Sequence, residues 1–277
     1  MKKIQLVVSD LDYTLLNSDR KLSPYTQQQL QKIVDAGVDV VPCSARPISQ
    51  IPSWFTDNPA VRYLVCSNGA VIMDNRTKTP VKQFTLSNQT VLDVIHTAAI
   101  TPYWTVAVDG QFHSHVDIIH DFEKIGRTEG FIENVLRTRI IEDNEEFILQ
   151  CEEGSIEKVH MITAALSSRQ RQQLICQLSE IEGIRISSSH PTNIEITHPD
   201  AGKGEAVRWL KQTLGLENSQ VIACGDNEND LPMLKEAGIR IAVANATFEV
   251  LACADITALS CDEDGVVRSV CELLEIE

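Results

Sequence analysis

The chain has 277 residues, of which 43% are hydrophobic and 23% are charged, and its formal net charge at pH 7 is -15. This composition is typical of a globular enzyme with one large or two moderate domains. The negative charge argues against nucleic acid and anionic membrane surfaces as partners, because both attract basic proteins. No apolar run approaches the roughly 18 residues that span a bilayer, and the eight cysteines form no CxxC pair. We therefore expect a cytoplasmic protein with reduced cysteines.

The first eighty residues alternate between short apolar runs and helical patterns. Ser23 followed by Pro24 predicts the start of a helix, and Gly37 predicts its end. A second helical stretch is predicted near 47–57. Strands are predicted over residues 4–9, 38–43 and 63–67. Such alternation is typical of right-handed βαβ units with a parallel sheet.

After about residue 83 the pattern changes. The run YWTVAVDGQFHSHV alternates around Asp109-Gly110, which predicts a β-hairpin. Its Tyr103 and Trp104 are assigned to the core of this segment, with a stacking platform as the alternative. Further elements are predicted at 158–163 (strand), 168–180 (helix) and 184–188 (strand). We expect an antiparallel α+β segment inserted over residues 84–189.

Strands and helices alternate again from residue 193. The predicted elements are the strand IEIT, a helix over 203–214, a strand over 220–224, a short helix over 229–237, a strand over 239–244 and helices near 247–253 and 264–274. The predicted fold is therefore α/β. It has a Rossmann-like parallel-sheet core, formed by residues 1–83 and 190–277, with an inserted α+β cap domain at 84–189.

Polar residues follow several of these predicted strands. Asp10 and Asp12 end the first strand, Ser44 follows the second, and Lys203 and the acidic run 225–230 lie in the last third of the chain. Ligands bind at the carboxyl ends of the strands in an open parallel sheet. Two aspartates, a hydroxyl, a lysine and a second acidic loop at one sheet edge predict magnesium-dependent phosphoryl transfer.

The Asp10-Leu11-Asp12 sequence is a candidate catalytic pair. Residues i and i+2 of an extended chain share a direction, so both carboxylates can face one reacting centre. One carboxylate can attack phosphorus to form an aspartyl-phosphate. The other can protonate the leaving oxygen and later take a proton from water. An acidic strand end without any catalytic role is the alternative interpretation.

The acidic run supplies a candidate metal ligand. Magnesium prefers oxygen ligands, usually one or two carboxylates with water and substrate phosphate, which suits Asp226 together with Asp10. An Asx-rich turn that caps the helix near Asn229 is a second interpretation of the same residues. Ser44 is compatible with phosphate binding or with a helix cap. Lys203 begins a helix, where a cation opposes the dipole and thus indicates an anionic partner.

Four stretches of the sequence resemble the motifs of one family. SDLDYTLL, CSAR, GKGEAV and GDNENDLPML are similar to the four motifs of haloacid dehalogenase (HAD) superfamily phosphatases of the Cof type with a type IIB cap. SNGAVI, AVANATFEV and DEDGVV resemble further stretches of that family. The resemblance covers both core segments, whereas the cap matches mainly in length and in its pattern of elements.

The resemblance implies catalytic and metal-binding roles. Asp10 is implied to be the nucleophile and Asp12 the general acid/base. Magnesium is implied to be held by the carboxylates of Asp10 and Asp226 and by the backbone carbonyl of Asp12. Asp230 is implied to support the metal or to orient Lys203.

It also implies a binding site for the transferring phosphoryl group. Ser44 and Lys203 are implied to bind this group, with Asn229 close to it. The implied partner is a small-molecule phosphate ester, and the implied reaction is hydrolysis. A cap that closes over the core is implied to exclude water and to select the leaving group.

Two positions depart from the family pattern. Tyr13 and Ala45 stand where the family commonly has glycine. Glycine lets the backbone bend tightly, so an aromatic residue at position 13 points away or narrows the mouth of the site. We predict that Tyr13 shapes the substrate entrance. Tyr13→Gly is then expected to change activity or specificity, and unchanged kinetics across a panel of phosphate esters would contradict this.

Other polar residues have less specific interpretations. His113 and His115 form an HxH sequence with His120 nearby, which fits a metal site or a polar hairpin face. Arg46 fits contact with a substrate anion or with an acidic neighbour.

Two alternatives to a phosphatase remain at this point. One is a sugar phosphomutase of the same cap type, and the other is a non-catalytic protein that senses a phosphorylated metabolite. An intact Asp10 and Asp12 pair argues against the sensor, because binding alone requires neither a nucleophile nor an acid.

Overall fold

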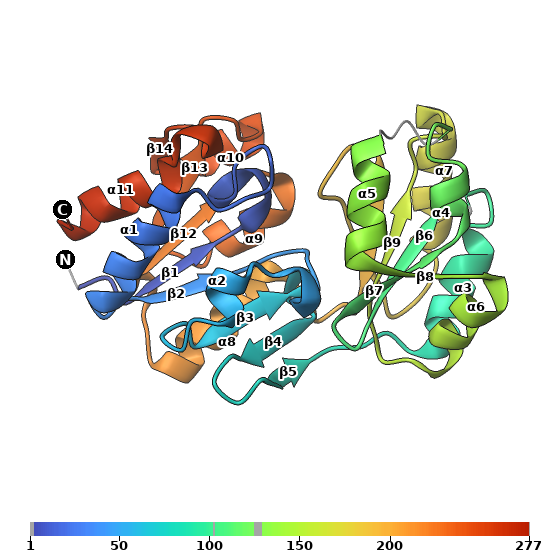
Figure 1. The fold of residues 1–277 in the computed structure, drawn as a ribbon, viewed down its shortest axis with the longest axis horizontal. Coiled ribbons are helices and arrows are strands. Elements are labelled where there is room, and N and C mark those ends of the chain that lie inside the picture. The colour runs from blue at the N-terminus through green and yellow to red at the C-terminus, as the bar shows by residue number, and fades with distance from the viewer. Residues whose placement is uncertain (1–2, 102, 125–128, 277) are drawn as a thin grey trace. The chain divides into compact units, whose positions relative to one another are not determined.

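The chain folds into two compact units (Figure 1). The computed structural model describes residues 3–101, 103–124 and 129–276. The first unit comprises residues 1–45, 51–82 and 202–277, and the second comprises residues 46–50 and 83–201. None of the helices in these described ranges is long and apolar enough to cross a membrane.

A five-stranded parallel sheet forms the centre of the first unit, in the order β14-β13-β12-β1-β2. Its strands are β1 (Leu6–Ser9), β2 (Asp39–Pro42), β12 (Val221–Gly225), β13 (Ile239–Val243) and β14 (Ile256–Ala258). Its helices are α1 (Pro24–Asp35), α2 (Ser53–Thr56), α8 (Lys203–Leu214), α9 (Leu231–Leu234), α10 (Phe248–Cys253) and α11 (Gly265–Leu274). The prediction of an α/β core with a parallel sheet is confirmed.

Apolar helix faces cover this sheet. Leu6 of β1 packs with Val207 and Leu210 of α8 in one buried cluster. Helix α1 begins where the sequence predicts, because the Ser23 side chain accepts a hydrogen bond from the Thr26 amide at 2.9 Å. Helices α1 and α11 lie beside each other (Figure 1). This packing holds the ends of the strands in place, and with them the loops that carry the site.

A second sheet of the first unit was not predicted. It contains β3 (Tyr63–Cys66), β4 (Val71–Asp74) and β5 (Thr79–Gln83), in that order. The prediction that the strand over 63–67 joins the parallel sheet is only partly right. That strand, β3, pairs antiparallel with β4 and meets the parallel sheet through one bridge between Cys43 and Val65. Strand β5 is mostly exposed, so it has no apolar pattern that the sequence could reveal.

The second unit is an α+β structure, as predicted. Its sheet has the order β10-β11-β9-β6-β7-β8. The strands are β6 (Trp104–Val108), β7 (Gln111–His115), β8 (Arg139–Glu142), β9 (Ile156–Ile162), β10 (Arg185–Ser187) and β11 (Asn193–Thr197). The helices are α3 (Asn88–Thr97), α4 (Asp117–His120), α5 (Glu129–Thr138), α6 (Asn144–Glu153) and α7 (Ser168–Leu178). The elements from α4 to α6 were not predicted.

The predicted hairpin is confirmed by β6 and β7, which pair antiparallel around Asp109 and Gly110. Both turn residues have positive φ, 47° and 81°, as a two-residue hairpin turn of the primed type requires. Trp104 and Tyr103 are buried in the two apolar clusters of this unit, so their assignment to its core is correct.

The strand IEIT was assigned to the wrong sheet. It lies in β11, which pairs antiparallel with β9 and β10 in the second unit instead of joining the parallel sheet. Its Ile194 and Ile196 belong to the apolar cluster of that unit. A short apolar run does not show which partner it pairs with, because its pattern is the same in either sheet. The first unit resumes at Gly202, twelve residues after the predicted boundary at 189/190.

Candidate active site

Three loops at one edge of the parallel sheet bring polar side chains together. Asp10 directly follows β1, Asp226 directly follows β12, and Ser44 lies two residues after β2. These strands are neighbours in the sheet, with Ser9 level with Cys224 in the register of β1 and β12. The carboxyl ends of the three strands therefore place these loops side by side, as the sequence predicts.

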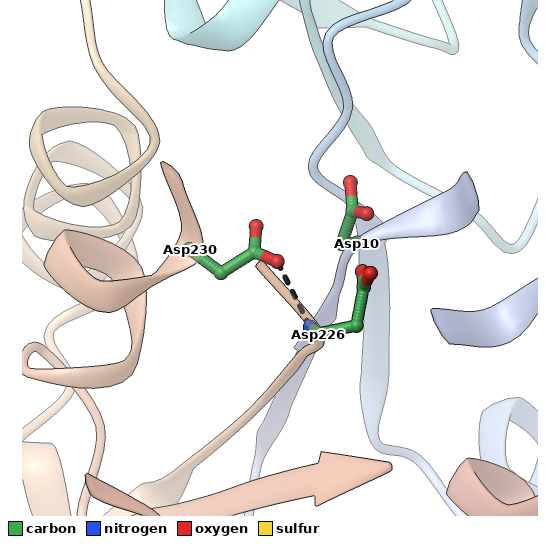
Figure 2. A group of neighbouring side chains, drawn as sticks. All are labelled: Asp10, Asp226 and Asp230. Atoms are coloured by element: carbon green, nitrogen blue, oxygen red, sulfur yellow. Dashed lines mark hydrogen bonds between the residues drawn. The ribbon is translucent and has the colours of Figure 1, made fainter. Parts of the chain in front are cut away.

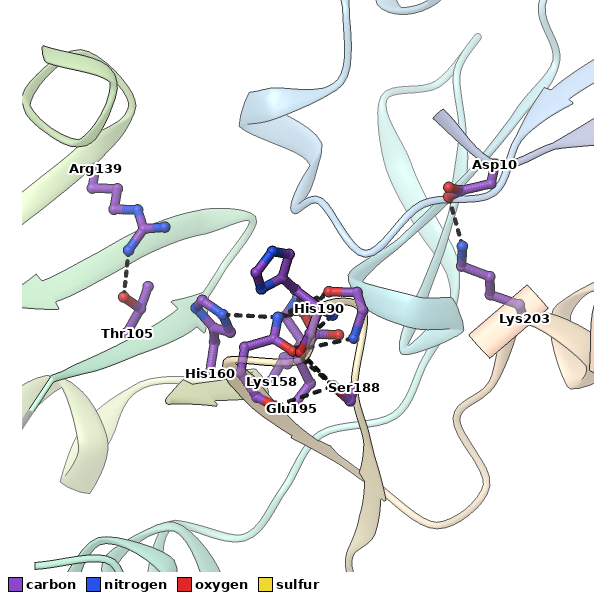
Figure 3. Close-up of polar contacts among 11 residues, drawn as sticks. Asp10, Thr105, Arg139, Lys158, His160, Ser188, His190, Glu195 and Lys203 are labelled. Carbon is purple, nitrogen blue, oxygen red and sulfur yellow. Dashed lines mark hydrogen bonds and ion pairs between the residues drawn. The ribbon is translucent and has the colours of Figure 1, made fainter. Parts of the chain in front are cut away.

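Lys203 links two of the buried carboxylates. It lies in the first turn of α8 and is 3% exposed. Its Nζ donates hydrogen bonds of 2.6 Å to Oδ1 of Asp10 and of 2.6 Å to Oδ1 of Asp230 (the bond to Asp10 is drawn in Figure 3). Charge-assisted hydrogen bonds of this kind are short and strong. The position of Lys203 at a helix start indicates an anionic partner, and Asp10 and Asp230 are such partners within the protein.

Asp230 uses both carboxylate oxygens inside the fold. Oδ1 accepts from Lys203, whereas Oδ2 accepts from the amides of Asp226 and Asn227 at 3.0 and 3.2 Å (the bond from Asp226 is drawn in Figure 2). Gly225 makes room for this arrangement, because a Cβ at that position would lie 2.6 Å from the Cβ of Asp230. Asp230 therefore orients Lys203 and shapes the loop that carries Asp226.

Three carboxylates form a cluster that suits a divalent cation. One oxygen from each of Asp10, Asp226 and Asp230 lies within 4.8 Å of the other two (Figure 2). Because Asp230 is committed to Lys203 and two amides, Asp10 and Asp226 are the residues with carboxylate oxygen to offer a metal. Hard oxygen donors of this kind are the ligands that magnesium prefers.

Burial and mutual repulsion shift the pKa values in this cluster. Burial raises the pKa of the Asp10 carboxyl well above its usual value, Lys203 opposes the rise, and Asp230 and Asp226 add to it. Burial, together with the charge of Asp230, raises the pKa of Asp226 to about 6. Burial alone lowers the pKa of Lys203, but the charges of Asp10 and Asp230 outweigh it and raise that pKa well above its usual value. With all three carboxyls ionised the cluster would hold more negative than positive charge, and a bound cation would relieve this excess.

Asp12 lies on a wide turn over Leu11–Leu15. Its side chain is 31% exposed and lies 3.9 Å from Nε of Arg20. The next residue, Tyr13, has φ 60° and ψ 9°, a left-handed conformation that glycine adopts more easily. The Tyr13 side chain is exposed, and the Arg20 guanidinium lies over its ring, 5.8 Å from the ring centroid. This exposed side chain matches one of the two alternatives stated for Tyr13, namely that it points away into solvent.

The structure places the remaining predicted site residues on the flanking loops. Ser44 is buried after β2, where its amide donates to the Val65 carbonyl at 2.9 Å. Asn229 lies in the turn Glu228–Asp230 and is partly exposed. The fold therefore brings Asp10, Asp226, Asp230 and Lys203 into direct contact or close approach. The roles of all the predicted site residues stay predictions, including those of Asp12, Ser44 and Asn229.

Sequence reasoning missed Thr14. Its Oγ1 donates a 2.6 Å hydrogen bond to Oδ1 of Asp226 and so connects the loop after β1 with the loop after β12. Thr14 lies inside the SDLDYTLL stretch, four residues after Asp10, but this local position does not reveal a bond to Asp226. A hydroxyl that donates to Asp226 also opposes the rise in the pKa of that carboxyl.

Among the described residues, the HxH histidines belong to no group of three or more metal-compatible ligands. His113 is buried and its Nδ1 lies 3.0 Å from Oε1 of Glu142, and Nδ1 of His115 lies 3.4 Å from a carboxylate oxygen of Asp117. The three-carboxylate cluster is the one metal-compatible group among the described residues. Arg46 donates from Nη1 to the Gln50 carbonyl at 2.9 Å within the second unit.

The second unit contains a polar cluster of its own on β9 and β11 (Figure 3). Nζ of Lys158 lies 3.5 Å from Oε1 of Glu195, and both side chains are buried. Burial lowers the pKa of Lys158, and the charge of Glu195 opposes this shift. Polar residues on β9 and β11 alternate with apolar residues that pack in the core, so Lys158, His160 and Glu195 share one face of this sheet.

Comparison with known proteins identifies the family of the chain. The sequence profile of the haloacid dehalogenase-like hydrolase family matches residues 7–270. YxeH of Bacillus subtilis is 29% identical over 276 residues, and the match covers 98% of each chain. The 5-amino-6-(5-phospho-D-ribitylamino)uracil phosphatase YcsE of the same organism is 27% identical over 269 residues, which cover 96% of this chain and 94% of YcsE.

The fold has a counterpart among solved structures. The HAD subclass IIB sugar phosphatase BT4131 superimposes with a TM-score of 0.78 at 16% identity, covering 97% of this chain and 98% of that one. This likeness confirms the fold of a parallel-sheet core with an inserted α+β unit. The chain therefore belongs to the haloacid dehalogenase-like hydrolases and is a phosphatase of the Cof type.

Proposed function

We propose that the protein hydrolyses small phosphomonoesters in a magnesium-dependent reaction that passes through an aspartyl-phosphate on Asp10. The observation that carries this proposal is the position of Asp10 at the end of β1, bound by Lys203 and beside Asp226. Lys203 keeps the carboxylate in one orientation, and its charge favours the anionic form that attacks phosphorus.

The proposed reaction has two steps. In the first, a carboxylate oxygen of Asp10 bonds to phosphorus while the bond from phosphorus to the ester oxygen breaks, and Asp12 donates a proton to the departing alcohol. In the second, Asp12 takes a proton from water as the water oxygen attacks phosphorus. Inorganic phosphate leaves and the Asp10 carboxylate is restored. The partial exposure of Asp12 is compatible with proton exchange in both steps.

Magnesium would be held by the carboxylates of Asp10 and Asp226 and by the backbone carbonyl of Asp12. When bound, it would supply positive charge against the negative charge of the transferring phosphoryl group. Thr14 holds Asp226 by its hydrogen bond. We assign binding of the phosphoryl oxygens to Ser44, Lys203 and Asn229, and the orientation of Lys203 to Asp230.

The proposed substrates are phosphate esters of small polyhydroxylated metabolites, such as sugar phosphates. YcsE, which acts by its name on a phosphorylated ribitylamino compound, supports this class. A phosphomutase would instead return the phosphoryl group to a sugar.

The test is hydrolysis of p-nitrophenyl phosphate with and without magnesium, by the wild type and by Asp10→Asn. We expect magnesium-dependent release of phosphate by the wild type and a loss of more than about 10⁴-fold in the variant, because the nucleophile is removed. Acid quenching of the wild type during turnover should trap phosphate on the protein, and Asp10→Asn should trap none. Wild-type activity that survives in Asp10→Asn would contradict the proposal, and absence of activity in the wild type would favour the mutase or the sensor.

A further inference from the structure

The loop between β13 and α10 contacts both loops that carry catalytic aspartates. Its Asn245 donates from Nδ2 to the backbone carbonyl of Tyr13 at 2.8 Å, in the turn that contains Asp12. Its Thr247 donates from the amide to the backbone carbonyl of Asp226 at 2.8 Å. A single short loop thus binds the loop after β1 and the loop after β12 by separate hydrogen bonds.

Together with one further hydrogen bond, these contacts form a closed ring. Thr14, the neighbour of Tyr13, donates from its hydroxyl to the carboxylate of Asp226 at 2.6 Å. The ring therefore runs from Tyr13 by a hydrogen bond to Asn245 and along the chain to Thr247. It continues by hydrogen bonds to Asp226 and from there to Thr14, the neighbour of Tyr13. A displacement of one aspartate-bearing loop relative to the other strains these bonds, so together they restrain the distance between the two loops.

The orientation of the Asn245 side chain is itself determined. Its Oδ1 accepts a hydrogen bond from the Cys261 amide at 2.9 Å. An amide group that accepts on its oxygen presents its NH₂ group on the other side, which is where the Tyr13 carbonyl lies. Both polar atoms of Asn245 are thus used for contacts with backbone groups.

The residue that Asn245 binds is held in an unfavourable backbone conformation. Tyr13 has φ 60° and ψ 9°, a region that costs residues other than glycine appreciable free energy. A hydrogen bond to the Tyr13 carbonyl stabilises this conformation from outside the turn. Without this hydrogen bond, we expect Tyr13 to relax toward negative φ. Such a change rotates the peptide groups that join Tyr13 to Asp12 and to Thr14.

We propose that Asn245 is a positioning residue for catalysis, which acts by holding Tyr13 in the left-handed conformation and so fixing Asp12 and Thr14. Asn245 acts in this role through its hydrogen bond to the Tyr13 carbonyl. The inference rests on the proposed function, because the turn it holds is the one that carries the proposed general acid/base. A glycine at position 13 would adopt positive φ without support, whereas a tyrosine there is stabilised by the hydrogen bond from Asn245.

A double-mutant cycle between positions 245 and 13 tests this. Asn245→Ala is expected to lower kcat for p-nitrophenyl phosphate at saturating magnesium by about 10- to 100-fold, the usual cost of losing a residue that orients a site ligand. In a Tyr13→Gly background the same substitution is expected to cost about tenfold less, because glycine takes positive φ without the penalty. Tyr13→Asn, another residue type that tolerates positive φ, provides a second cycle with the same expectation.

Asn58→Ala is the matched control. Asn58 also donates from Nδ2, to Oε1 of Gln31 at 3.1 Å, and accepts from a backbone amide, that of Ala60, at 3.0 Å. This variant removes an equivalent pair of hydrogen bonds in the same unit, and its kcat should equal that of the wild type. A purely structural role for Asn245 predicts equal behaviour of the two alanine variants.

Two outcomes would overturn the inference. One is wild-type kcat in Asn245→Ala. The other is a loss that is the same in the wild-type, Tyr13→Gly and Tyr13→Asn backgrounds, since additive effects show that Asn245 does not act through this residue. The Asp10→Asn experiment keeps the two proposals apart. If Asp10→Asn is inactive and Asn245→Ala is normal, the inference alone fails; if Asp10→Asn retains activity, the proposed function fails.

Discussion

Replacing Lys203 by methionine is expected to destabilise the protein by about 3–5 kcal/mol and to abolish turnover. Methionine keeps most of the side-chain length but removes the charge that bonds to Asp10 and Asp230. Both carboxylates are buried. Removing one partner of a buried ion pair leaves an uncompensated charge, which lowers the free energy of unfolding by about 3–5 kcal/mol. Urea unfolding followed by circular dichroism measures the change in the free energy of unfolding.

A second substitution shows whether unpaired charge is the cause. Asp230→Asn in the Lys203→Met background removes one of the stranded charges while keeping an oxygen that can accept from the amides of Asp226 and Asn227. The double variant should therefore be more stable than Lys203→Met alone. Lys235→Met, at an exposed position, is the matched control and should change stability by less than about 0.5 kcal/mol. A double variant less stable than the single one would contradict the explanation.

Replacing Asp226 by asparagine is expected to stabilise the metal-free protein while it abolishes turnover. The Asp226 carboxyl keeps its proton up to about pH 6 in the folded protein, whereas in the unfolded chain it loses the proton near pH 4. As pH rises from about 4 to about 6, the unfolded state binds fewer protons than the native state, so stability falls. Above about pH 6 the whole loss is present. Asparagine carries no charge and so removes this loss. We expect the free energy of unfolding to rise by about 1–2 kcal/mol at pH 7.5.

The comparison needs two conditions besides pH 7.5 without metal. Below about pH 4 the wild type and Asp226→Asn should have similar stability, because the aspartate is then protonated in both states. With magnesium present, the wild type should gain stability as the ion binds the native state, by about 2.7 kcal/mol at a hundredfold excess over the dissociation constant, and the variant should gain little. An Asp226→Asn variant that is less stable than the metal-free wild type at pH 7.5 would contradict the expected repulsion.

Much of the fold could be predicted because its signals are local. Apolar runs of four or five residues, a serine before a proline and an Asp-Gly pair mark strands, a helix start and a hairpin within a few positions of the chain. The structure confirms each of these at β1, α1 and the β6–β7 turn. Strand β11 shows the limit, since pairing depends on what lies beside a strand and not on its own residues.

The candidate site shows the same division. Asp10, Asp226, Asp230 and Lys203 could be selected from the sequence because each sits at a strand end or helix start within a recognisable motif. Thr14 and Asn245 could not, because their importance lies in bonds to residues 212 and 232 positions away. Such contacts form only when the sheet order brings distant loops to one edge.

The sequence by itself determined the family, the parallel-sheet core and the residue types available for phosphoryl transfer, because these depend on composition, periodicity and short motifs. Only the tertiary structure decided what each carboxylate is free to do. Asp230 has both oxygens committed to Lys203 and two amides, whereas Asp10 and Asp226 have oxygen to offer a metal. The physical reason is that hydrogen bonding and desolvation act over a few ångströms in space, and the strand order β12-β1-β2 sets those distances.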